Sequence, residues 1–390
     1  MNFILFDGAY REALLPFTYT RPVADIRIGI TTIREKWEYL LRNTTTTVTE
    51  EYLSEKWPMV EAEQNIFICG SVLPTEKLVD KVKALQVGEA IYADKELLAF
   101  CAKENEEPDL EVYKTIEFTE ELIIVKHTWD IFKFNEKAIK ADFKIVTQDG
   151  QSQKLSQTNT IIGEHPIYIE NGASVECTIF NTSKGPIYIG KNATIMEGSI
   201  IRGPFALCES STVKMGAKIY EGTTVGPHSK VGGEIGNSVI FGYSNKGHDG
   251  YLGNSVLGEW CNLGADTNTS NLKNNYAEVR LWDYETEGFA RTGEQFCGLM
   301  MGDHSKSGIN TMFNTGTVVG VSANIFGGGF PRNFIPSFSW GGSASMVTYK
   351  TNKAFEVASK VMNRRNIEFS KQDQTIMEKV FELSLKWRKD

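Results

Sequence analysis

Aliphatic residues recur at every sixth position through the middle of the chain. If about one residue in five is Leu, Ile or Val, a run of this length arises by chance on the order of once in a few hundred thousand trials. A small residue stands four positions after most members, and Leu257 and Leu263 resume the spacing after a short slip. The unbroken series is Ile189, Ile195, Ile201, Leu207, Val213, Ile219, Val225 and Val231.

A six-residue period matches neither an α-helix nor the simple alternation of a strand. It is typical of a coil with flat faces, in which each face points one apolar residue inward and stacked coils bury an aliphatic column. Gly and Asn would occupy corners that need a positive φ. We therefore expect a left-handed parallel β-helix of hexapeptide repeats over about residues 161 to 342. A Gly-rich β-sandwich is the alternative.

Outside the repeat the sequence is typical of mixed α/β structure at the start and of helices at the end. The stretch from Leu272 to Cys297 interrupts the repeat and predicts a projecting loop or hairpin. We expect an α/β domain over 1–150, the β-helix over 160–345 and a C-terminal helical cap over 346–390. Short apolar runs predict strands, and one-sided apolar spacing predicts a helix: the strands are Asn2–Phe6, Ile66–Cys69 and Leu122–Val125, and the helix is Thr75–Leu85.

Charge and cysteine usage limit the partners and the compartment. The net charge of −8 argues against nucleic acid or an acidic membrane surface as the main partner. The six cysteines contain no CxxC pair, which favours a reduced, cytoplasmic setting over a zinc site or disulfide framework. The N-terminus has no basic region before its apolar run, and no stretch approaches the roughly 20 apolar residues of a membrane span.

Two segments within the repeat carry a specific motif. The first reads GHDGYLGN from Gly247, and the second reads NLGADTNTSN from Asn262. They resemble the acetyltransferase half of the bifunctional GlmU family, whose pattern runs GHxxYLGD and then NIGAGTxxxN. The spacing from His248 to Tyr251, Asn262, Ala265 and Asn271 agrees with that pattern. The whole chain resembles the divergent GlmU-like sugar nucleotidyltransferases of Bacteroidetes type.

That resemblance implies acyl transfer from acetyl-CoA to an amino-sugar 1-phosphate. An amine attacks a thioester only as its free base, and a His of near-neutral pKa suits the removal of its proton. The family's site forms between adjacent subunits, which implies a homotrimer. Lys214, Lys230, Lys246 and Lys273 are candidates for holding the phosphate, although each also fits a solvated charge. The implied roles are His248 as base, Asn271 holding its ring, Tyr251 and Asn262 contacting the sugar phosphate, and Gly264 and Ala265 lying near the acetyl-CoA arm.

The N-terminal third resembles sugar-1-phosphate nucleotidylyltransferases, whose first strand leads into a Gly-rich phosphate loop. Here the first strand is followed by Asp7-Gly8-Ala9-Tyr10-Arg11 and later by Arg21-Pro22. The resemblance implies a Rossmann-like fold, nucleotide binding by Gly8, Arg11 and Arg21, and Mg²⁺ binding by Asp130. Ser71 stands where the family has another metal-binding Asp, and loss of a carboxylate weakens a site for a hard cation.

These features predict a bifunctional transferase that acetylates glucosamine-1-phosphate and joins the product to UTP or dTTP. Its expected product is a nucleotide sugar such as UDP-N-acetylglucosamine. Two alternatives stay open. One is a regulatory or scaffold protein with a degenerate nucleotide site, as Ser71 suggests. The other is a γ-class carbonic anhydrase, whose fold is shared but whose three zinc-binding His would have to come from His165, His228, His248 and His304.

Overall fold

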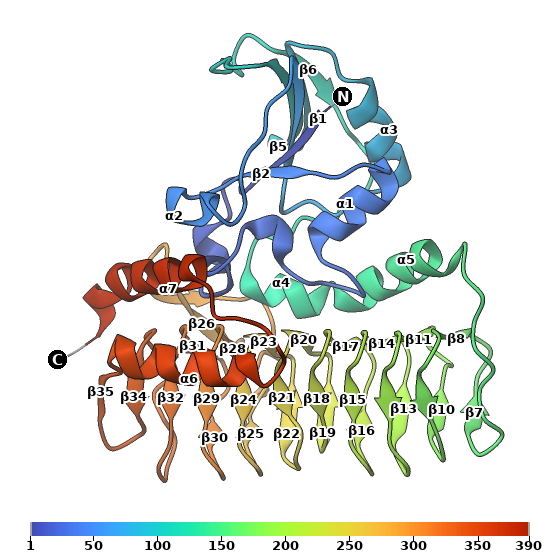
Figure 1. The fold of residues 1–390 in the computed structure, drawn as a ribbon, viewed down its shortest axis with the longest axis vertical. Coiled ribbons are helices and arrows are strands. Elements are labelled where there is room, and N and C mark those ends of the chain that lie inside the picture. The colour runs from blue at the N-terminus through green and yellow to red at the C-terminus, as the bar shows by residue number, and fades with distance from the viewer. Residues whose placement is uncertain (1, 389–390) are drawn as a thin grey trace. The chain divides into compact units, whose positions relative to one another are not determined.

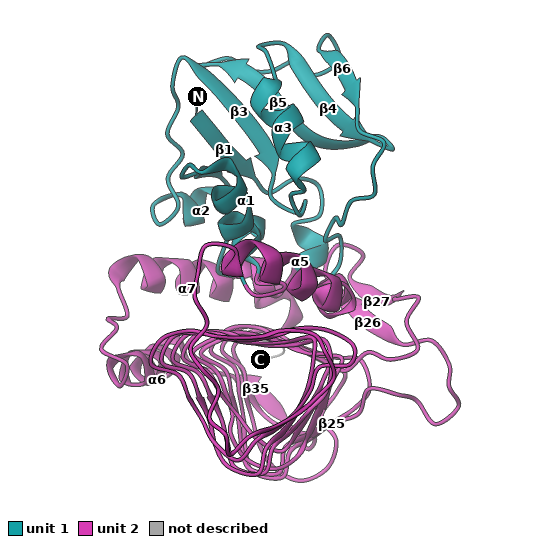
Figure 2. Cartoon of the chain, turned by 90° about the vertical axis from the view of Figure 1, so that its right-hand side faces the viewer, with its two compact units in different colours: residues 1–14, 20–26, 31–127 teal, residues 15–19, 27–30, 128–390 magenta. Residues whose placement is uncertain are grey.

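The computed structural model describes residues 2–388, which divide into two compact units. The first unit takes residues 1–14, 20–26 and 31–127, and the second takes 15–19, 27–30 and 128–390 (Figure 2). The chain therefore passes from one unit to the other several times near its start. The predicted domain limits near residues 150 and 345 remain a prediction, since compactness alone does not define a domain.

The first unit is built on one mixed six-stranded sheet in the order β2-β1-β3-β5-β4-β6. β1 pairs in parallel with β2 and β3, whereas β5 runs antiparallel to β3 and β4. This arrangement fits the predicted Rossmann-like fold. The strands are β1 (Asn2–Phe6), β2 (Thr46–Val48), β3 (Gln64–Cys69), β4 (Glu89–Ala93), β5 (Glu96–Lys103) and β6 (Lys114–Glu117), and the α-helices are α1 (Ile33–Leu41), α2 (Glu51–Ser54) and α3 (Glu76–Ala84).

Most elements predicted for this unit are confirmed. β1 and β3 match the two apolar runs, and α3 lies within Thr75–Leu85, with the Thr75 hydroxyl capping it by accepting the Leu78 N–H. The strand predicted at Leu122–Val125 is wrong. That segment makes one isolated bridge, from Ile124 to Val72, and its backbone contacts the loop after β3 instead of joining the sheet.

The second unit is dominated by a parallel β-helix whose strands stack into three faces (Figure 1). The first face contains β7 (Thr160–Ile162), β10 (Ile179–Asn181), β13 (Ile200–Arg202), β16 (Lys218–Ile219), β19 (Glu234–Gly236) and β22 (Tyr251–Gly253). The second contains β8 (Ile167–Ile169), β11 (Ile187–Ile189), β14 (Phe205–Leu207), β17 (Thr223–Val225), β20 (Val239–Gly242), β23 (Val256–Glu259), β28 (Leu299–Met301), β31 (Thr317–Val319) and β33 (Phe334–Ile335). The third contains β9 (Ser174–Val175), β12 (Thr194–Ile195), β15 (Thr212–Val213), β18 (Lys230–Val231), β21 (Asn245–Lys246), β24 (Asn262–Leu263), β29 (Lys306–Ser307), β32 (Asn324–Ile325), β34 (Ser339–Gly341) and β35 (Met346–Thr348).

The predicted aliphatic series forms the core of this β-helix. Ile201 pairs in register with Phe180 on one side and Ile219 on the other, and all three side chains are buried. The adjacent residue on the same strand, Ile200, points outward and is 45% exposed. The first face thus contributes one inward column, as the six-residue period predicts, whereas strands of the second face bury two side chains each, such as Ile187 and Ile189 of β11.

The slip in the period has a structural cause. On the second face, Val225 pairs with Ile240 and Ile240 with Leu257, so these coils are shorter than the regular coil of three hexads. The next residue in that column, Met301, follows only after an excursion of the chain. The excursion confirms the predicted insertion as an antiparallel hairpin of β26 (Arg280–Asp283) and β27 (Gly288–Arg291), which leaves the coil after β25 (Asn268–Thr269), the partner of β30 (Met312–Phe313).

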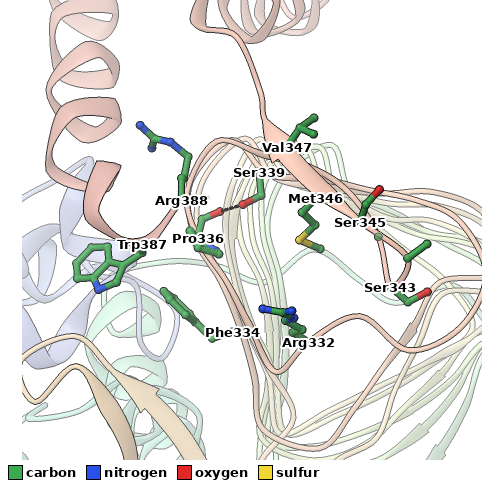
Figure 3. Close-up of a pocket in the computed structure, with 12 residues that line it drawn as sticks. Arg332, Phe334, Pro336, Ser339, Ser343, Ser345, Met346, Val347, Trp387 and Arg388 are labelled. Atoms are coloured by element: carbon green, nitrogen blue, oxygen red, sulfur yellow. Dashed lines mark hydrogen bonds between the residues drawn. The ribbon is translucent and has the colours of Figure 1, made fainter. Parts of the chain in front are cut away.

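Helices complete the second unit. In Figure 1, α6 (Thr351–Asn363) runs beside the coils, and α7 (Lys371–Leu383) and the short helix Leu385–Trp387 follow it. At the last coils, a cavity of about 200 Å³ is lined by Phe334, Trp387 and Arg388, among others (Figure 3). After its two short early segments, the chain returns to this unit at α4 (Thr128–Lys133) and α5 (Asn135–Thr147). The Asn135 amide donates to Gly222 O at 2.7 Å. No helix within residues 2–388 is long and apolar enough to cross a membrane.

Replacing an inward residue of β13 should lower the free energy of unfolding far more than replacing its outward neighbour. Ile201→Ala leaves a cavity in a closed core, so we expect a loss of about 2–5 kcal/mol in the free energy of unfolding. Ile200→Ala removes the same atoms from the outer side of β13, where a change of about 0.5 kcal/mol is typical. Urea unfolding followed by circular dichroism measures both, and equal losses would contradict the inward column.

Candidate functional site

The predicted base, His248, lies in the turn Gly247–Gly250 between β21 and β22. Its side chain is exposed at a corner of the β-helix. Gly250 adopts a φ of +113°, and a Cβ there would lie 2.2 Å from Thr267 O, so only glycine fits this close approach to the next coil. The turn therefore holds the imidazole outside the core in a defined backbone conformation.

A buried lysine inside the coil donates hydrogen bonds to the backbone of this turn. Lys246 is 1% exposed and occupies an inward position of the third face, where its neighbour in the column is Val231. Its ammonium donates to the carbonyl oxygens of Gly232 at 3.3 Å, His248 at 2.5 Å and Asp249 at 3.0 Å. Burial lowers the pKa of Lys246 to about 8. The interpretation of Lys246 as a solvated or phosphate-binding charge is wrong, because its donors are used inside the coil.

Two other predicted residues meet beside the turn. The Asn271 amide donates to Tyr251 Oη at 3.0 Å and to Asn254 Oδ1 at 2.8 Å. Burial is the main cause that raises the pKa of Tyr251. Within residues 2–388 of one chain, no hydrogen bond joins Asn271 to the His248 ring, so its predicted role in holding that ring remains a prediction.

The predicted acetyl-CoA contacts lie on the next coil. The turn that contains Gly264 and Ala265 stacks on the His248 turn, since Asp266 N–H donates to Asp249 O at 3.1 Å. A Cβ at Gly264 would lie 2.5 Å from the Gly308 carbonyl, which explains why this corner contains glycine. Asn262 lies just before this turn on β24, and its side chain is exposed. Backbone and short side chains thus line one corner over successive coils.

In the first unit, the predicted phosphate loop is organised around Asp7. Arg11 donates to Asp7 Oδ2 at 2.7 Å and to Tyr52 Oη at 3.1 Å. The Asp7 carboxylate also accepts from the Val23 N–H at 2.7 Å, while Gly8 adopts a φ of +69°. Arg21 is 5% exposed. Asp7 is not among the predicted site residues, although a carboxylate directly after the first strand and four positions before Arg11 was the available signal.

The predicted Mg²⁺ ligand, Asp130, lies on the first turn of α4. Its carboxylate belongs to a residue that is 7% exposed. Ser71 is fully buried with its hydroxyl 3.2 Å from Cys69 Sγ. Among the described residues, no three His, Cys, Asp or Glu side chains gather in a way that could hold a metal. The described residues therefore offer no set of three side chains for the zinc of a γ-class carbonic anhydrase. A Mg²⁺ site needs only one or two carboxylates completed by substrate phosphates, so the predicted Mg²⁺ role of Asp130 stays a prediction.

Comparison with known proteins supports the resemblance seen in the motifs. Residues 3–151 match the family model of sugar nucleotidyl transferases. A bifunctional sugar-1-phosphate nucleotidylyltransferase/acetyltransferase from Sulfurisphaera tokodaii is 26% identical over 182 residues, which cover 46% of this chain and 44% of the relative. The bifunctional protein GlmU from Methanocaldococcus jannaschii is 33% identical over 120 residues, which cover 30% of this chain and 26% of the relative.

The similarity covers only part of this chain and only part of each relative. The chain spans less than half the length of these two curated relatives. Among solved structures, LpxA, a UDP-N-acetylglucosamine acyltransferase from Bacteroides fragilis, is 15% identical with a TM-score of 0.27, and the match covers 58% of this chain and 96% of that chain. The predicted similarity to GlmU-like proteins is confirmed, and the family match together with the two curated relatives supports a transferase.

The buried ammonium of Lys246 predicts a measurable pH dependence. The folded chain releases this proton near pH 8 and the unfolded chain near the ordinary value of 10.5. Between these values the unfolded state binds more protons, so this group makes the free energy of unfolding rise with pH. We expect the free energy of unfolding of the wild type, relative to Lys246→Met, to increase from pH 8 to pH 10.5 in urea titrations. Lys218→Met, which removes an exposed charge from β16, is the control. A relative stability that stays flat or falls would refute the buried cation.

Proposed function

We propose that the β-helix of this chain catalyses acetyl transfer from acetyl-CoA to the amino group of an amino-sugar 1-phosphate, with glucosamine-1-phosphate as the acceptor. One observation carries the proposal. The exposed His248 lies on a turn whose backbone accepts a hydrogen bond from the buried Lys246. The hydrogen-bonded pair of Tyr251 and Asn271 follows this turn, and the Gly264–Ala265 turn stacks on it. The similarity to named nucleotidylyltransferase/acetyltransferases supports the same reaction.

The chain supplies the groups that such a reaction needs. Acetyl-CoA, when bound, provides the acyl thioester. His248 accepts the proton that the attacking amine loses as its nitrogen bonds to the acetyl carbon, and it can return that proton to the departing thiolate. Tyr251 keeps its own proton because burial raises its pKa. Since its oxygen accepts from Asn271, the Tyr251 O–H is available to donate to the acceptor sugar.

One chain leaves this site open, because the His248 side chain is exposed. A second copy against this corner would exclude water from the imidazole and provide the walls that a small substrate needs. We therefore propose a homotrimer with its sites at the contacts between copies. The six cysteines are free, which fits a cytoplasmic setting where acetyl-CoA is present.

We also propose that the first unit binds a nucleoside triphosphate, UTP or dTTP, and that the chain forms a nucleotide sugar such as UDP-N-acetylglucosamine. The family match over residues 3–151 and the positive φ of Gly8 after β1 support nucleotide binding. The competing function is a scaffold with a degenerate site, which the buried Ser71 favours. Calorimetric titration with UTP and dTTP, with and without added Mg²⁺, separates them, and absence of heat with either nucleotide would favour the scaffold.

The acetyltransferase proposal is tested by release of CoA in the presence of glucosamine-1-phosphate. We expect His248→Ala to lower kcat by about 10²–10⁴-fold, the range of general-base catalysis. His165→Ala removes another exposed imidazole from the β-helix and should keep the activity, so it is the matched control. Gel filtration of both variants checks that the assembly is unchanged.

Two outcomes would reject the proposal. One is that the wild type releases no CoA with any of several amino-sugar phosphates. The other is that His248→Ala and His165→Ala lose activity equally, which would place the reaction elsewhere.

A further inference from the structure

Another cavity lies in the second unit, and His248 is not among the residues that line it. It has a volume of about 350 Å³, within the range of small-molecule pockets. Its walls are the outer side of the third face, through β18 and β29, and the residues at the end of α6. Four cationic side chains line it, and its lining includes no carboxylate. These cations are Lys230, Lys306, Arg364 and Arg365.

These four side chains form no ion pair with any residue that the structure describes. Lys306 donates to His304 O at 2.8 Å and Arg365 to His228 O at 3.1 Å, which leaves other donors of both groups unused. Desolvation and the neighbouring Arg365 lower the pKa of Lys230, and burial lowers the pKa of Lys306 to about 8. Like charges held together without a counterion repel one another, and a bound polyanion would remove that repulsion.

Two aromatic residues that line the cavity, Tyr243 and Trp260, belong to a column of stacked rings. His228, Tyr243, Trp260 and His304 stack at successive coils, with ring centroids 4.9, 4.2 and 6.1 Å apart and planes within 14° of parallel. All four adopt a positive φ, between 54° and 61°, which bulky residues rarely do. Stacking covers the faces of the Tyr243 and Trp260 rings with neighbouring rings. These covered faces leave little room for stacking of a flat ligand ring, so the cations are the main binding groups of the cavity.

We propose that this cavity binds a small molecule with two or more phosphate groups, held by Lys230, Lys306, Arg364 and Arg365. Four converging cations exceed what one phosphate needs, and charge-assisted bonds to phosphate are strong. Three molecules share this chemistry: free pyrophosphate, a nucleoside diphosphate and CoA. Asn262 also lines the cavity, so its ligand contacts the coil predicted to bind the sugar phosphate. The inference does not depend on acetyl transfer, because it concerns binding alone.

Calorimetric titration of the full chain with pyrophosphate, ADP and CoA, in buffer without divalent cations, tests the site. We expect at least one of them to bind with one site per chain and to bind more weakly as salt increases. Lys306→Met should weaken that binding about tenfold or more, and Arg364→Ala should weaken it as well. Arg364 is exposed, so its replacement keeps the fold even if Lys306→Met does not. Lys360→Ala removes a cation from the same helix that pairs with Glu356 outside the cavity, and it should leave binding unchanged.

The comparison of ligands identifies the source of the phosphates. Tightest binding of pyrophosphate supports a site for the free anion, whereas tighter binding of ADP or CoA supports a site that includes a nucleoside. The inference is overturned if none of the three binds, if pantetheine binds as well as CoA, or if Arg364→Ala and Lys360→Ala bind alike. None of these results depends on CoA release, so failure here and failure of the acetyltransferase proposal can be told apart.

Discussion

The structure of the second unit depends on the stacking of one coil on the next. Each coil gives its backbone donors and acceptors to its neighbours and the inward side chains of its faces to a shared core. Neither contribution is sufficient alone, because a single coil has unpaired backbone on both sides and an uncovered apolar interior. The same stacking forms the candidate site, because the turns of His248 and Gly264 belong to adjacent coils and therefore lie together.

Lys246 shows how such a scaffold can be adapted locally. An inward position normally contains an aliphatic residue, and an ammonium there is costly unless its donors are satisfied. Here three carbonyl oxygens satisfy them, two of which belong to the turn that carries His248. A core position has thereby become a support for a surface turn. The same reasoning applies to the cation-lined cavity beside α6, where Lys306 follows a corner and the charge is left without a counterion among the described residues.

Much of this could be predicted from the sequence, because local repetition determines the β-helix. The six-residue series identified Ile201 and its neighbours in the column, and the motif spacing identified the His248 and Gly264 turns. Other features depend on contacts between distant parts of the chain. The run Leu122–Val125 is as apolar as β3, yet it contacts a loop in place of the sheet. The cavity lined by Lys230 and Arg364 joins residues more than a hundred positions apart, and no periodic pattern links them.

Because α5 is anchored to the β-helix, a β-helix fragment needs residues that precede the repeats. Asn135 bonds to Gly222 O and to Thr224, and Ile139 and Phe143 pack with Ile30, Tyr188 and Ala206. A fragment that began after Thr147 would retain every repeat but expose that apolar patch and leave Gly222 O without its amide donor. The smallest autonomous β-helix is therefore longer than its repeats, and two short segments from the first thirty residues belong to it.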